Sequence, residues 1–568
     1  MSVLETLKYH FYAKWLIIIT GNGQTLLRIL AMPRQSPIEQ ARRWWKEHAD
    51  ADHYVVPPAA APSAAVARVL RQEGLVMDVA GKRAWILTAQ RPLDRRAVFI
   101  ANYWPVVALV LGRYEPAAIA GLGAIKLHLE DFSPPEELLA HQSANQSEYG
   151  LPLEPGFIMR LRPRDVPAGR LHFVYAPGGV KIPVLSAADI VSTLDEREIN
   201  AGIEPVSAWL RHLVIRTPDL ERASTEKPRA ATLQRLADMA GALNNDPLAR
   251  QLDAAARRIS ARISPPSRTG VGTRIQVPPL LQRAPRGSGS PWSDEQAMRL
   301  ARQESEIRDL VGAQAKTLST FSWRTLRASA EQVKAYDAYH STTMEGYRIS
   351  REISDAIVRG EPLPDGPQDR ETLQAAMAIQ GYSIAFNEVL ARAQRKAPVD
   401  TDLILDLYEA LFRPSVDAGI TDSAALRGWR NSSVGLRGWR YVPPNPKKIQ
   451  DLIGGLERFA ARKDLSPIGR SLLVHLEFVT IHPFMDGNVR LGRLLMNHVL
   501  LSAGLPWVTI RSDERVPFFK AIEQAQVDGD AVPFIRFVWH LIQQSAMDLQ
   551  RKRSGRKPAR KTPRRRPV

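Results

Sequence analysis

The spacing of apolar residues predicts an N-terminal half of mixed helices and strands and a C-terminal half that is helical throughout. An amphipathic helix begins at Ser36, a residue type that caps helix N-termini, and a second helix covers residues 63–71. Two apolar runs at 75–79 and 84–88 flank a glycine turn at 80–82 and predict a β-hairpin. Helices that end in a β-hairpin are typical of a winged helix-turn-helix and also of a generic small α/β unit, and the pattern leaves both open.

Apolar runs and helical periods alternate over residues 92–260, with strands predicted at 98–100, 157–161 and 171–175 and a helix at 233–243. A stretch rich in proline, glycine and serine then predicts a linker. The resulting prediction is a multidomain protein with an α+β N-terminal half. Its parts are an uncertain extension (1–31), a winged helix-turn-helix-like domain (32–91), an α/β domain (92–260), the linker (261–292), a helical region (293–400), a helical core (401–550) and a basic tail (551–568).

Composition adds a charge asymmetry and several exclusions. The formal net charge is +18, and residues 551–568 supply ten lysines and arginines and no acid. A tail of this kind is predicted to be disordered and to seek polyanions. The chain has no cysteine, which excludes disulfides, thiolate metal sites and cysteine nucleophiles. No apolar run approaches the roughly 20 residues of a membrane span, so we expect a cytoplasmic protein that does not contact a membrane.

Candidate chemistry is concentrated in residues 481–493. An apolar helical run is broken by Pro483, a polar loop follows, and a second helix with a buried apolar face begins. Because the first N–H groups of a helix are unpaired and the helix dipole is positive there, this loop is a predicted anion site. Arg490 and Arg493 are three residues apart and share a helix face, so both can reach one phosphate chain.

Three further side chains of this segment suit phosphate chemistry. Asp486 offers hard oxygen ligands for magnesium, His482 can accept a proton from a hydroxyl, and Asn488 can offer its amide to a phosphate oxygen. A metal cluster of His482 with His475 and Glu477 is not expected, because these side chains do not converge on a helix.

The residues His482, Phe484, Asp486, Gly487, Asn488, Arg490 and Arg493 resemble the core motif of the Fic family of protein adenylyltransferases, H-x-F-x-[D/E]-G-N-[G/K]-R-x-x-R. Residues 341–346 look like the family's inhibitory helix pattern, [S/T]-x-x-x-E-[G/N], and residues 429–444 are similar to its β-hairpin flap. The resemblance covers about 293–549. It implies a mainly α-helical Fic fold with a β-hairpin flap in this half.

The resemblance also implies roles for individual residues. His482 would be the catalytic base that deprotonates a serine, threonine or tyrosine hydroxyl of a target protein, including the chain itself. AMP would pass from ATP to that hydroxyl, with pyrophosphate released. Asp486 would bind Mg²⁺, and the nucleotide would be bound by Gly487, Asn488, Arg490 and Arg493. Inhibition would come from Ser341, Glu345 and Gly346, with Glu345 paired to Arg493. The target would dock on four residues of the flap, Val434, Leu436, Trp439 and Tyr441.

Val489 departs from the motif, which has glycine or lysine at this position. A β-branched residue there predicts backbone strain of about 1–3 kcal/mol and a weakened or altered nucleotide site. The N-terminal half resembles, through residues 84–88 and 184–189, the abortive-infection type IV antitoxins, which are winged-helix transcriptional repressors. Duplex DNA would then be contacted at its phosphates by four basic residues, Arg68, Arg71, Lys82 and Arg83.

Two functions from different classes follow. The first is a protein adenylyltransferase restrained by Glu345. The second is a DNA-binding transcriptional regulator, antitoxin-like, whose Fic domain is degenerate and senses nucleotides. The intact His482, Asp486 and arginines favour the first function, and Val489 favours the second.

Overall fold

The computed structural model describes residues 36–50, 54–89, 94–143, 147–223, 230–262, 289–361, 370–436 and 438–553. The predicted N-terminal extension, most of the predicted linker and most of the predicted tail lie outside these residues. The chain divides into two compact units, Met1–Arg113 with Pro152–Pro155 and Tyr114–Leu151 with Gly156–Val568. Each unit is described by itself below.

The first unit contains the predicted helices and the predicted hairpin. Its elements are α1 (Pro37–Asp50), β1 (Val55–Val56), a 3₁₀ turn (Pro58–Ala60), α2 (Ala64–Gln72), β2 (Val76–Val79), β3 (Ala84–Leu87), α3 (Arg95–Ala101) and α4 (Tyr103–Leu111). The three strands form an antiparallel sheet in the order β1-β3-β2. Trp44 of α1 and Trp85 of β3 meet edge to face in its core.

The strand predicted at 98–100 is wrong, because these residues lie in α3. The valine and isoleucine of this run favour a strand. Asp94 decides the outcome, since its carboxylate accepts a hydrogen bond from the Ala97 N–H at 2.9 Å and caps a helix.

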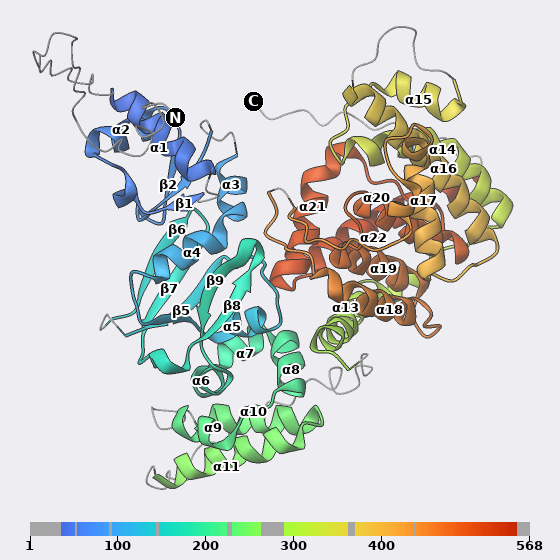
Figure 1. Ribbon diagram of the computed structural model, residues 1–568. Coiled ribbons are helices and arrows are strands. Elements are labelled where there is room, and N and C mark those ends of the chain that lie inside the picture. The colour runs from blue at the N-terminus through green and yellow to red at the C-terminus, as the bar shows by residue number, and fades with distance from the viewer. Residues whose placement is uncertain are drawn as a thin grey trace, which may run out of the picture. The chain divides into compact units, whose positions relative to one another are not determined.

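The second unit begins with a six-stranded mixed sheet in the order β6-β7-β5-β4-β9-β8 (Figure 1). Its strands are β4 (Ala117–Ile119), β5 (Glu137–Gln142), β6 (Tyr149–Glu154), β7 (Phe157–Pro163), β8 (His172–Ala176) and β9 (Val180–Val184). The helices of this part are α5 (Gly121–His128), α6 (Ala187–Thr193), α7 (Glu196–Ala201), α8 (Ile203–His212), α9 (Thr217–Ala223), α10 (Ala230–Ala242) and α11 (Asp246–Arg262). The predicted strands at 157–161 and 171–175 and the predicted helix at 233–243 are confirmed as β7, β8 and α10 within a few residues at their ends.

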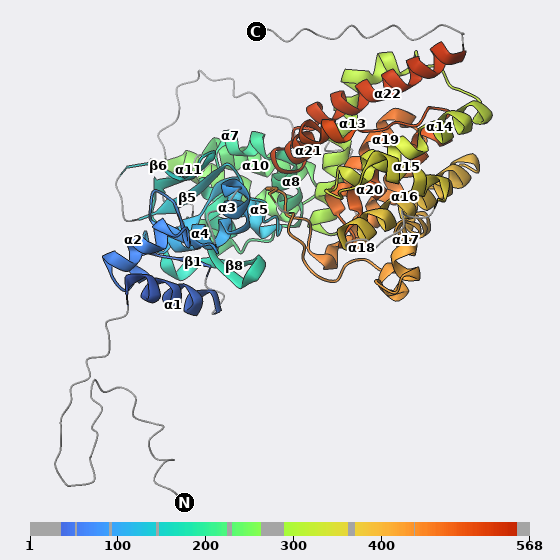
Figure 2. The ribbon, with the colours of Figure 1, turned by 90° about the horizontal axis from the view of Figure 1, so that it is seen from above.

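The remainder of the second unit is helical, as predicted. It comprises α13 (Pro291–Ala315), α14 (Trp323–Thr343), α15 (Arg351–Arg359), α16 (Arg370–Gln394), α17 (Thr401–Asp417), α18 (Ile449–Ala460), α19 (Pro467–Ile481), α20 (Asn488–Ser502), α21 (Arg515–Glu523) and α22 (Val532–Arg553). The helices α19 and α20 lie at the centre of this bundle in both ribbon views (Figures 1 and 2). Nearly every residue of these two helices is buried, so the loop that joins them is held by packing from all sides.

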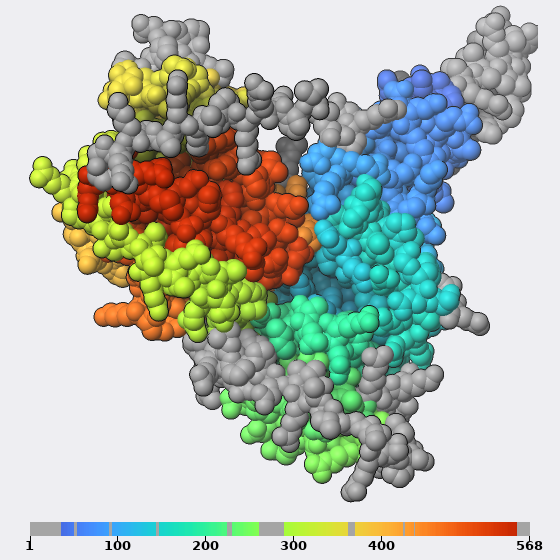
Figure 3. Space-filling view, turned by 180° about the vertical axis from the view of Figure 1, so that it is seen from behind, coloured from blue at the N-terminus to red at the C-terminus, as the bar shows by residue number. Residues whose placement is uncertain are grey.

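On the outer surface of this bundle α13 and α22 lie side by side (Figure 3). The indole N–H of Trp539 in α22 donates to Gln314 Oε1 in α13 at 3.1 Å. These two long helices therefore pack against each other on one side of the bundle.

Three boundary or segment predictions are corrected. The described residues of 429–444 contain no strand, so the predicted β-hairpin flap is a loop. The main-chain N–H of Arg430 and that of Arg440 are bonded to Pro483 O and Glu523 Oε2, outside the segment, rather than across a hairpin. Helices extend into both ends of the predicted linker, to Arg262 and from Pro291, and into the predicted tail as far as Arg553.

Among the helices of the described residues, none is long and apolar enough to cross a membrane.

Candidate functional site

The loop between α19 and α20 has a fixed shape, which its own residues impose. The side-chain amide of Asn488 accepts from Phe484 N at 3.0 Å and donates to Phe484 O at 2.8 Å. Gly487 has φ +77°, and a Cβ atom at this position would lie 3.0 Å from the Phe412 ring. Only glycine fits here. The amide of Asn488, predicted to meet a phosphate, is engaged in the loop, so its contribution in this structure is to shape the site.

Phe484 anchors the loop in the core, as its apolar character predicts. Its ring stacks on Tyr408 at a centroid distance of 3.6 Å and an interplanar angle of 5°, and Trp429 lies 5.4 Å away.

His482 ends α19 in a strained conformation. Its φ and ψ are 51° and 58°, the left-handed region that non-glycine residues avoid, and such strain is concentrated at functional sites. The imidazole Nδ1 lies 3.3 Å from Val479 O. Because a carbonyl oxygen only accepts, this contact assigns the proton to Nδ1 and leaves the lone pair on Nε2. Burial lowers the pKa of His482 to about 4, so the ring is neutral at physiological pH and can accept a proton.

Two buried arginines in the first turns of α20 converge on one carboxylate. Arg490 and Arg493 are 1% and 2% exposed. Arg490 Nε donates to Glu345 Oε2 at 2.6 Å, and Arg493 Nη2 lies 3.4 Å from Glu345 Oε1. Glu345 follows the end of α14, as predicted. The predicted pairing of Glu345 with Arg493 is present at 3.4 Å, and Arg490, which the prediction did not pair with Glu345, makes the shorter contact.

Arg493 is held mainly by the end of α14. Its Nη2 donates to the main-chain carbonyl of Ser341 at 2.8 Å. The Ser341 hydroxyl points elsewhere and donates to Tyr382 at 3.1 Å. Ser341 therefore contacts Arg493 through its backbone and not through its hydroxyl.

The pKa values of this cluster shift in the directions that burial and pairing require. Burial raises the pKa of the Glu345 carboxyl, and Arg490 and Arg493 oppose that rise. The pKa of Arg490 is raised, because the attraction of Glu345 and Asp486 outweighs the effect of burial. An arginine guanidinium stays charged in a protein, so two buried guanidiniums need an anion between them.

Asp486 lies at the solvent side of the same cluster, with 55% of its side chain exposed. Its Oδ1 accepts from Gly487 N at 2.6 Å, and its Oδ2 lies 3.3 Å from Arg490 Nη2. Among the described residues no group of three or more histidine, cysteine or acidic side chains could hold a metal. A single exposed carboxylate beside an anion site fits Mg²⁺ that arrives with a nucleotide, since Mg²⁺ is commonly held by one or two carboxylates and substrate phosphates.

Val489 is the second residue of α20, with 9% of its surface exposed, and belongs to an apolar cluster that includes Met344 and Val479. It has helical geometry rather than the left-handed geometry that glycine alone adopts freely. The predicted backbone strain at Val489 is therefore wrong. The residue that needs glycine is Gly487.

The predicted docking residues do not act as one surface. Tyr441 is buried, and its hydroxyl donates to Thr480 O at 2.6 Å. Trp439 packs on Phe519 at a centroid distance of 4.8 Å. Val434 is half-buried and Leu436 lies two residues further along the same loop, and both remain candidates for target contact.

Sequence reasoning missed two residues that contact the loop. Arg430 Nε donates to His482 O at 2.8 Å and its Nη2 to Pro444 O at 2.5 Å, so it ties the end of α19 to the 429–444 loop. The hydroxyl of Tyr347 donates to Asp486 Oδ2 at 3.3 Å. Only the place of Tyr347 next to Gly346 could have signalled its role, and no sequence signal marks Arg430.

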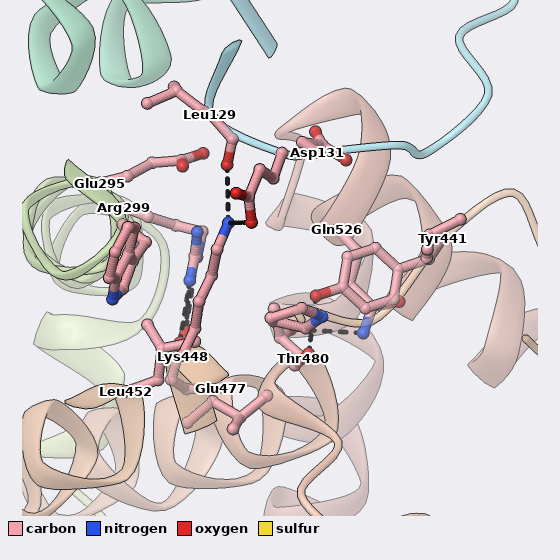
Figure 4. Close-up of a pocket in the computed structure, with 15 residues that line it drawn as sticks. Leu129, Asp131, Glu295, Arg299, Tyr441, Lys448, Leu452, Glu477, Thr480 and Gln526 are labelled. Atoms are coloured by element: carbon pink, nitrogen blue, oxygen red, sulfur yellow. Dashed lines mark hydrogen bonds and ion pairs between the residues drawn. The ribbon is translucent and has the colours of Figure 1, made fainter. Parts of the chain in front are cut away.

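A cavity of about 80 Å³ is lined by residues of α13, α18 and α19, among them Arg299, Leu452 and Thr480 (Figure 4). Lys448 Nζ donates to Leu129 O at 2.8 Å, and Arg299 Nη2 pairs with Glu477 Oε1 at 2.9 Å. Glu477 is thus engaged with α13, whereas His475 stacks on Phe534. The two side chains do not converge, as the sequence predicts.

The four basic residues of the first unit differ in their surroundings. Arg71 pairs with Asp78 at 2.9 Å and lies over Trp85, and the Arg83 side chain donates to Ala80 O at 3.4 Å. Arg68 lies on α2, and Lys82 lies in the hairpin turn. Because Arg71 and Arg83 are engaged within the unit, Arg68 and Lys82 are the better placed of the four for a phosphate contact.

Comparison with known proteins identifies the helical region that contains the loop between α19 and α20. Residues 398–500 match the family model described as Fic/DOC family. The chain is 32% identical over 207 residues to protein adenylyltransferase Fic of Nematostella vectensis, covering 35% of this chain and 45% of that protein. It is 28% identical over 216 residues to the protein of the same name in Drosophila erecta, covering 38% and 41%. The C-terminal half of the protein contains a Fic domain.

The chain spans less than half the length of these relatives. A Fic domain-containing signalling protein of Bacteroides thetaiotaomicron aligns with a TM-score of 0.36 and 18% identity, over 46% of this chain and 100% of that one.

Proposed function

We propose that the C-terminal half is a protein adenylyltransferase that transfers AMP from ATP to a hydroxyl of a target protein, and that Glu345 restrains it. The observation that carries the proposal is the convergence of buried Arg490 and Arg493 on the Glu345 carboxylate, 2.6 and 3.4 Å away. We expect phosphate oxygens to bind to the two guanidiniums in place of the carboxylate oxygens. The relatives' name, protein adenylyltransferase, supports the same reaction.

The proposed reaction assigns a role to each polar side chain of the loop. Nε2 of His482 accepts the proton of a serine, threonine or tyrosine hydroxyl. The hydroxyl oxygen attacks the α-phosphorus of ATP, and the bond from that phosphorus to the bridging oxygen of the β-phosphate breaks, so pyrophosphate leaves. Arg490, Arg493 and the first N–H groups of α20 bind and neutralise the phosphates. Asp486 would hold Mg²⁺, which neutralises phosphate charge when bound.

Restraint is a competition for the arginines. One guanidinium cannot serve the Glu345 carboxylate and a phosphate in bidentate geometry at once. While Glu345 is in place, the nucleotide is displaced from the arginines, and the α-phosphorus is not aligned with the attacking oxygen.

Label transfer from ATP carrying ³²P at the α-phosphate tests the proposal. We expect the Glu345→Gly variant to label itself or an added protein faster than wild type by about 5- to 150-fold, the range that a coupling free energy of about 1–3 kcal/mol gives. Glu345→Gln should be intermediate, because it keeps the size of the side chain and loses the charge. Adding His482→Ala to Glu345→Gly should abolish transfer.

Glu352→Gly is the matched control, since Glu352 is exposed in the first turn of α15. It should transfer at the wild-type rate. No gain in Glu345→Gly refutes the restraint, and transfer that survives the loss of His482 refutes the mechanism.

We also propose that the first unit binds duplex DNA. The layout of α1, α2 and a sheet in the order β1-β3-β2 supports this, because α2 carries Arg68 and the hairpin turn carries Lys82. Removing one phosphate-binding side chain should reduce the slope of log affinity against log salt by about one. The full chain with both residues changed to alanine should therefore show a slope that is smaller by about two units.

The control is the exposed pair Arg395 and Lys396 changed to alanine. It should behave as wild type. Specific binding should also survive removal of residues 551–568. Binding that disappears with this tail would indicate nonspecific attraction only.

A further inference from the structure

The loop that follows Glu345 covers the candidate site at a second point. Gly346 has φ +99°, and Tyr347 after it is half-buried against α20. The Tyr347 hydroxyl donates to Asp486 Oδ2 at 3.3 Å. The Arg490 guanidinium carbon lies 5.3 Å from the centre of the Tyr347 ring. One aromatic side chain thus contacts both the carboxylate and the first arginine of the site.

Both contacts oppose the binding of a metal–nucleotide complex. An oxygen that accepts a hydrogen bond from the Tyr347 hydroxyl must lose that bond before it can ligate a cation in the same direction. The ring also lies over Arg490, whose other aromatic neighbour is Phe412 at 5.4 Å. A cation over an aromatic ring is held by an electrostatic attraction, so the Tyr347 ring stabilises the present position of the Arg490 guanidinium.

We infer that Tyr347 is a second occluding residue, which competes with the divalent cation for Asp486 independently of Glu345. The inference rests on the proposed function of this site. Glu345 blocks the arginines and Tyr347 blocks the carboxylate, so the closed site is occupied at both of the points where a metal–nucleotide complex is expected to bind.

The chain geometry allows the two contacts to open separately. Before Glu345, the backbone is fixed by Arg515, whose Nε donates to Met344 O at 2.8 Å. After Glu345 comes Gly346, and among the described residues no atom outside its two chain neighbours lies within 4 Å of the place of a Cβ. Rotation at this glycine can move Tyr347 away from Asp486 while the end of α14 stays in place. Removal of the Glu345 carboxylate alone therefore leaves the Tyr347 contact intact.

Binding of Mn²⁺, followed by electron paramagnetic resonance of the free ion in the presence of a non-hydrolysable ATP analogue, measures the competition without catalysis. Tyr347→Phe keeps the ring and removes the hydroxyl. In the Glu345→Gly background it should increase Mn²⁺ affinity about fivefold, because one hydrogen bond of ordinary net strength no longer competes. Tyr347→Ala should increase it further. The Mg²⁺ concentration that gives half-maximal label transfer should fall by a similar factor.

Tyr339→Phe is the matched control, since Tyr339 is half-buried on α14 and packs on His340. It should leave Mn²⁺ affinity unchanged, and Asp486→Ala should weaken it. Equal affinities for Tyr347→Phe and its parent, with Asp486→Ala still weak, overturn the Tyr347 inference and leave the proposed function standing. An equal gain in Tyr339→Phe overturns it as well. If Asp486→Ala binds Mn²⁺ as its parent does, the proposed cation ligand is wrong and the Tyr347 inference fails with it.

Discussion

Replacing Val489 by glycine separates two accounts of the departure from the motif. If the branched side chain strained the loop, glycine would relieve the strain and increase activity. The structure instead predicts no gain in activity and a loss of stability, because Val489 is a helical residue of α20 whose side chain is buried in an apolar cluster. Glycine there removes buried methyl groups and adds backbone freedom to the first turn of the helix that carries both arginines.

The magnitude follows from burial. Burying a valine side chain stabilises a protein by about 1.5–3 kcal/mol, and glycine is about 1 kcal/mol less favourable than alanine in a helix interior, less so in the first turn. We therefore expect Val489→Ala to destabilise the helical region by about 1–2 kcal/mol and Val489→Gly by about 2–3 kcal/mol. Both variants reduce side-chain volume, and only glycine has ready access to left-handed backbone angles.

The assay measures label transfer and calorimetric unfolding of both variants in the Glu345→Gly background. Alanine is the control for the reduced volume. If Val489 is an ordinary helix residue, glycine transfers label no faster than alanine and unfolds at a lower temperature. If Val489→Gly transfers label faster than both Val489→Ala and the parent, and is as stable as Val489→Ala, the packing argument is refuted and the backbone-strain explanation is supported.

Two further predictions concern the base and its surroundings. As the pH is lowered while staying above the His482 pKa of about 4, the wild-type rate should rise relative to the rate of Glu345→Gly. Burial raises the pKa of Glu345, so its carboxylate takes up a proton at a higher pH than a carboxyl in water does, and protonation weakens its ion pairs. A ratio that stays flat or falls contradicts this. Arg430→Lys should reduce kcat about tenfold with little change in nucleotide affinity, because a single ammonium cannot make the bonds to His482 O and Pro444 O together. Arg427→Lys, an exposed control, should change neither, and a weaker nucleotide affinity in Arg430→Lys would contradict the assignment.

The sequence predicted the helix–loop–helix of the site because each of its signals is local. Pro483 and Gly487 end one helix and begin another, and the apolar faces on either side can be read without any partner. The spacing of Arg490 and Arg493 was enough to place both side chains on one face. The resemblance of residues 341–346 to the family's inhibitory helix pattern indicated Glu345 at the end of a helix, although nothing in the sequence fixes a distance between residues that are 145 positions apart.

Failures of prediction arose where long-range contacts decide the conformation. The 429–444 loop reads as two strand-like pieces, but Arg440 pairs with Glu523 and Asp528, and Tyr441 bonds Thr480 O, so the segment is fastened to other elements. The error at Val489 was of another kind. A motif position that the family fills with glycine predicts a need for glycine, whereas the left-handed residue of this loop is Gly487.

The inhibition that we propose and the stability of the site have one physical source. Two buried guanidiniums without an anion are costly, and removal of one partner from a buried ion pair typically costs about 3–5 kcal/mol. Glu345 supplies the missing charge when no nucleotide is bound, so the contact that we propose to block the phosphates also stabilises the site. Glu345→Gly should therefore unfold at a lower temperature than wild type without ATP, and ATP with Mg²⁺ should raise its unfolding temperature by more than it raises that of wild type, because phosphates then restore the charge balance around Arg490 and Arg493. An equal rise in both proteins would mean that the carboxylate and the phosphates do not share the two arginines.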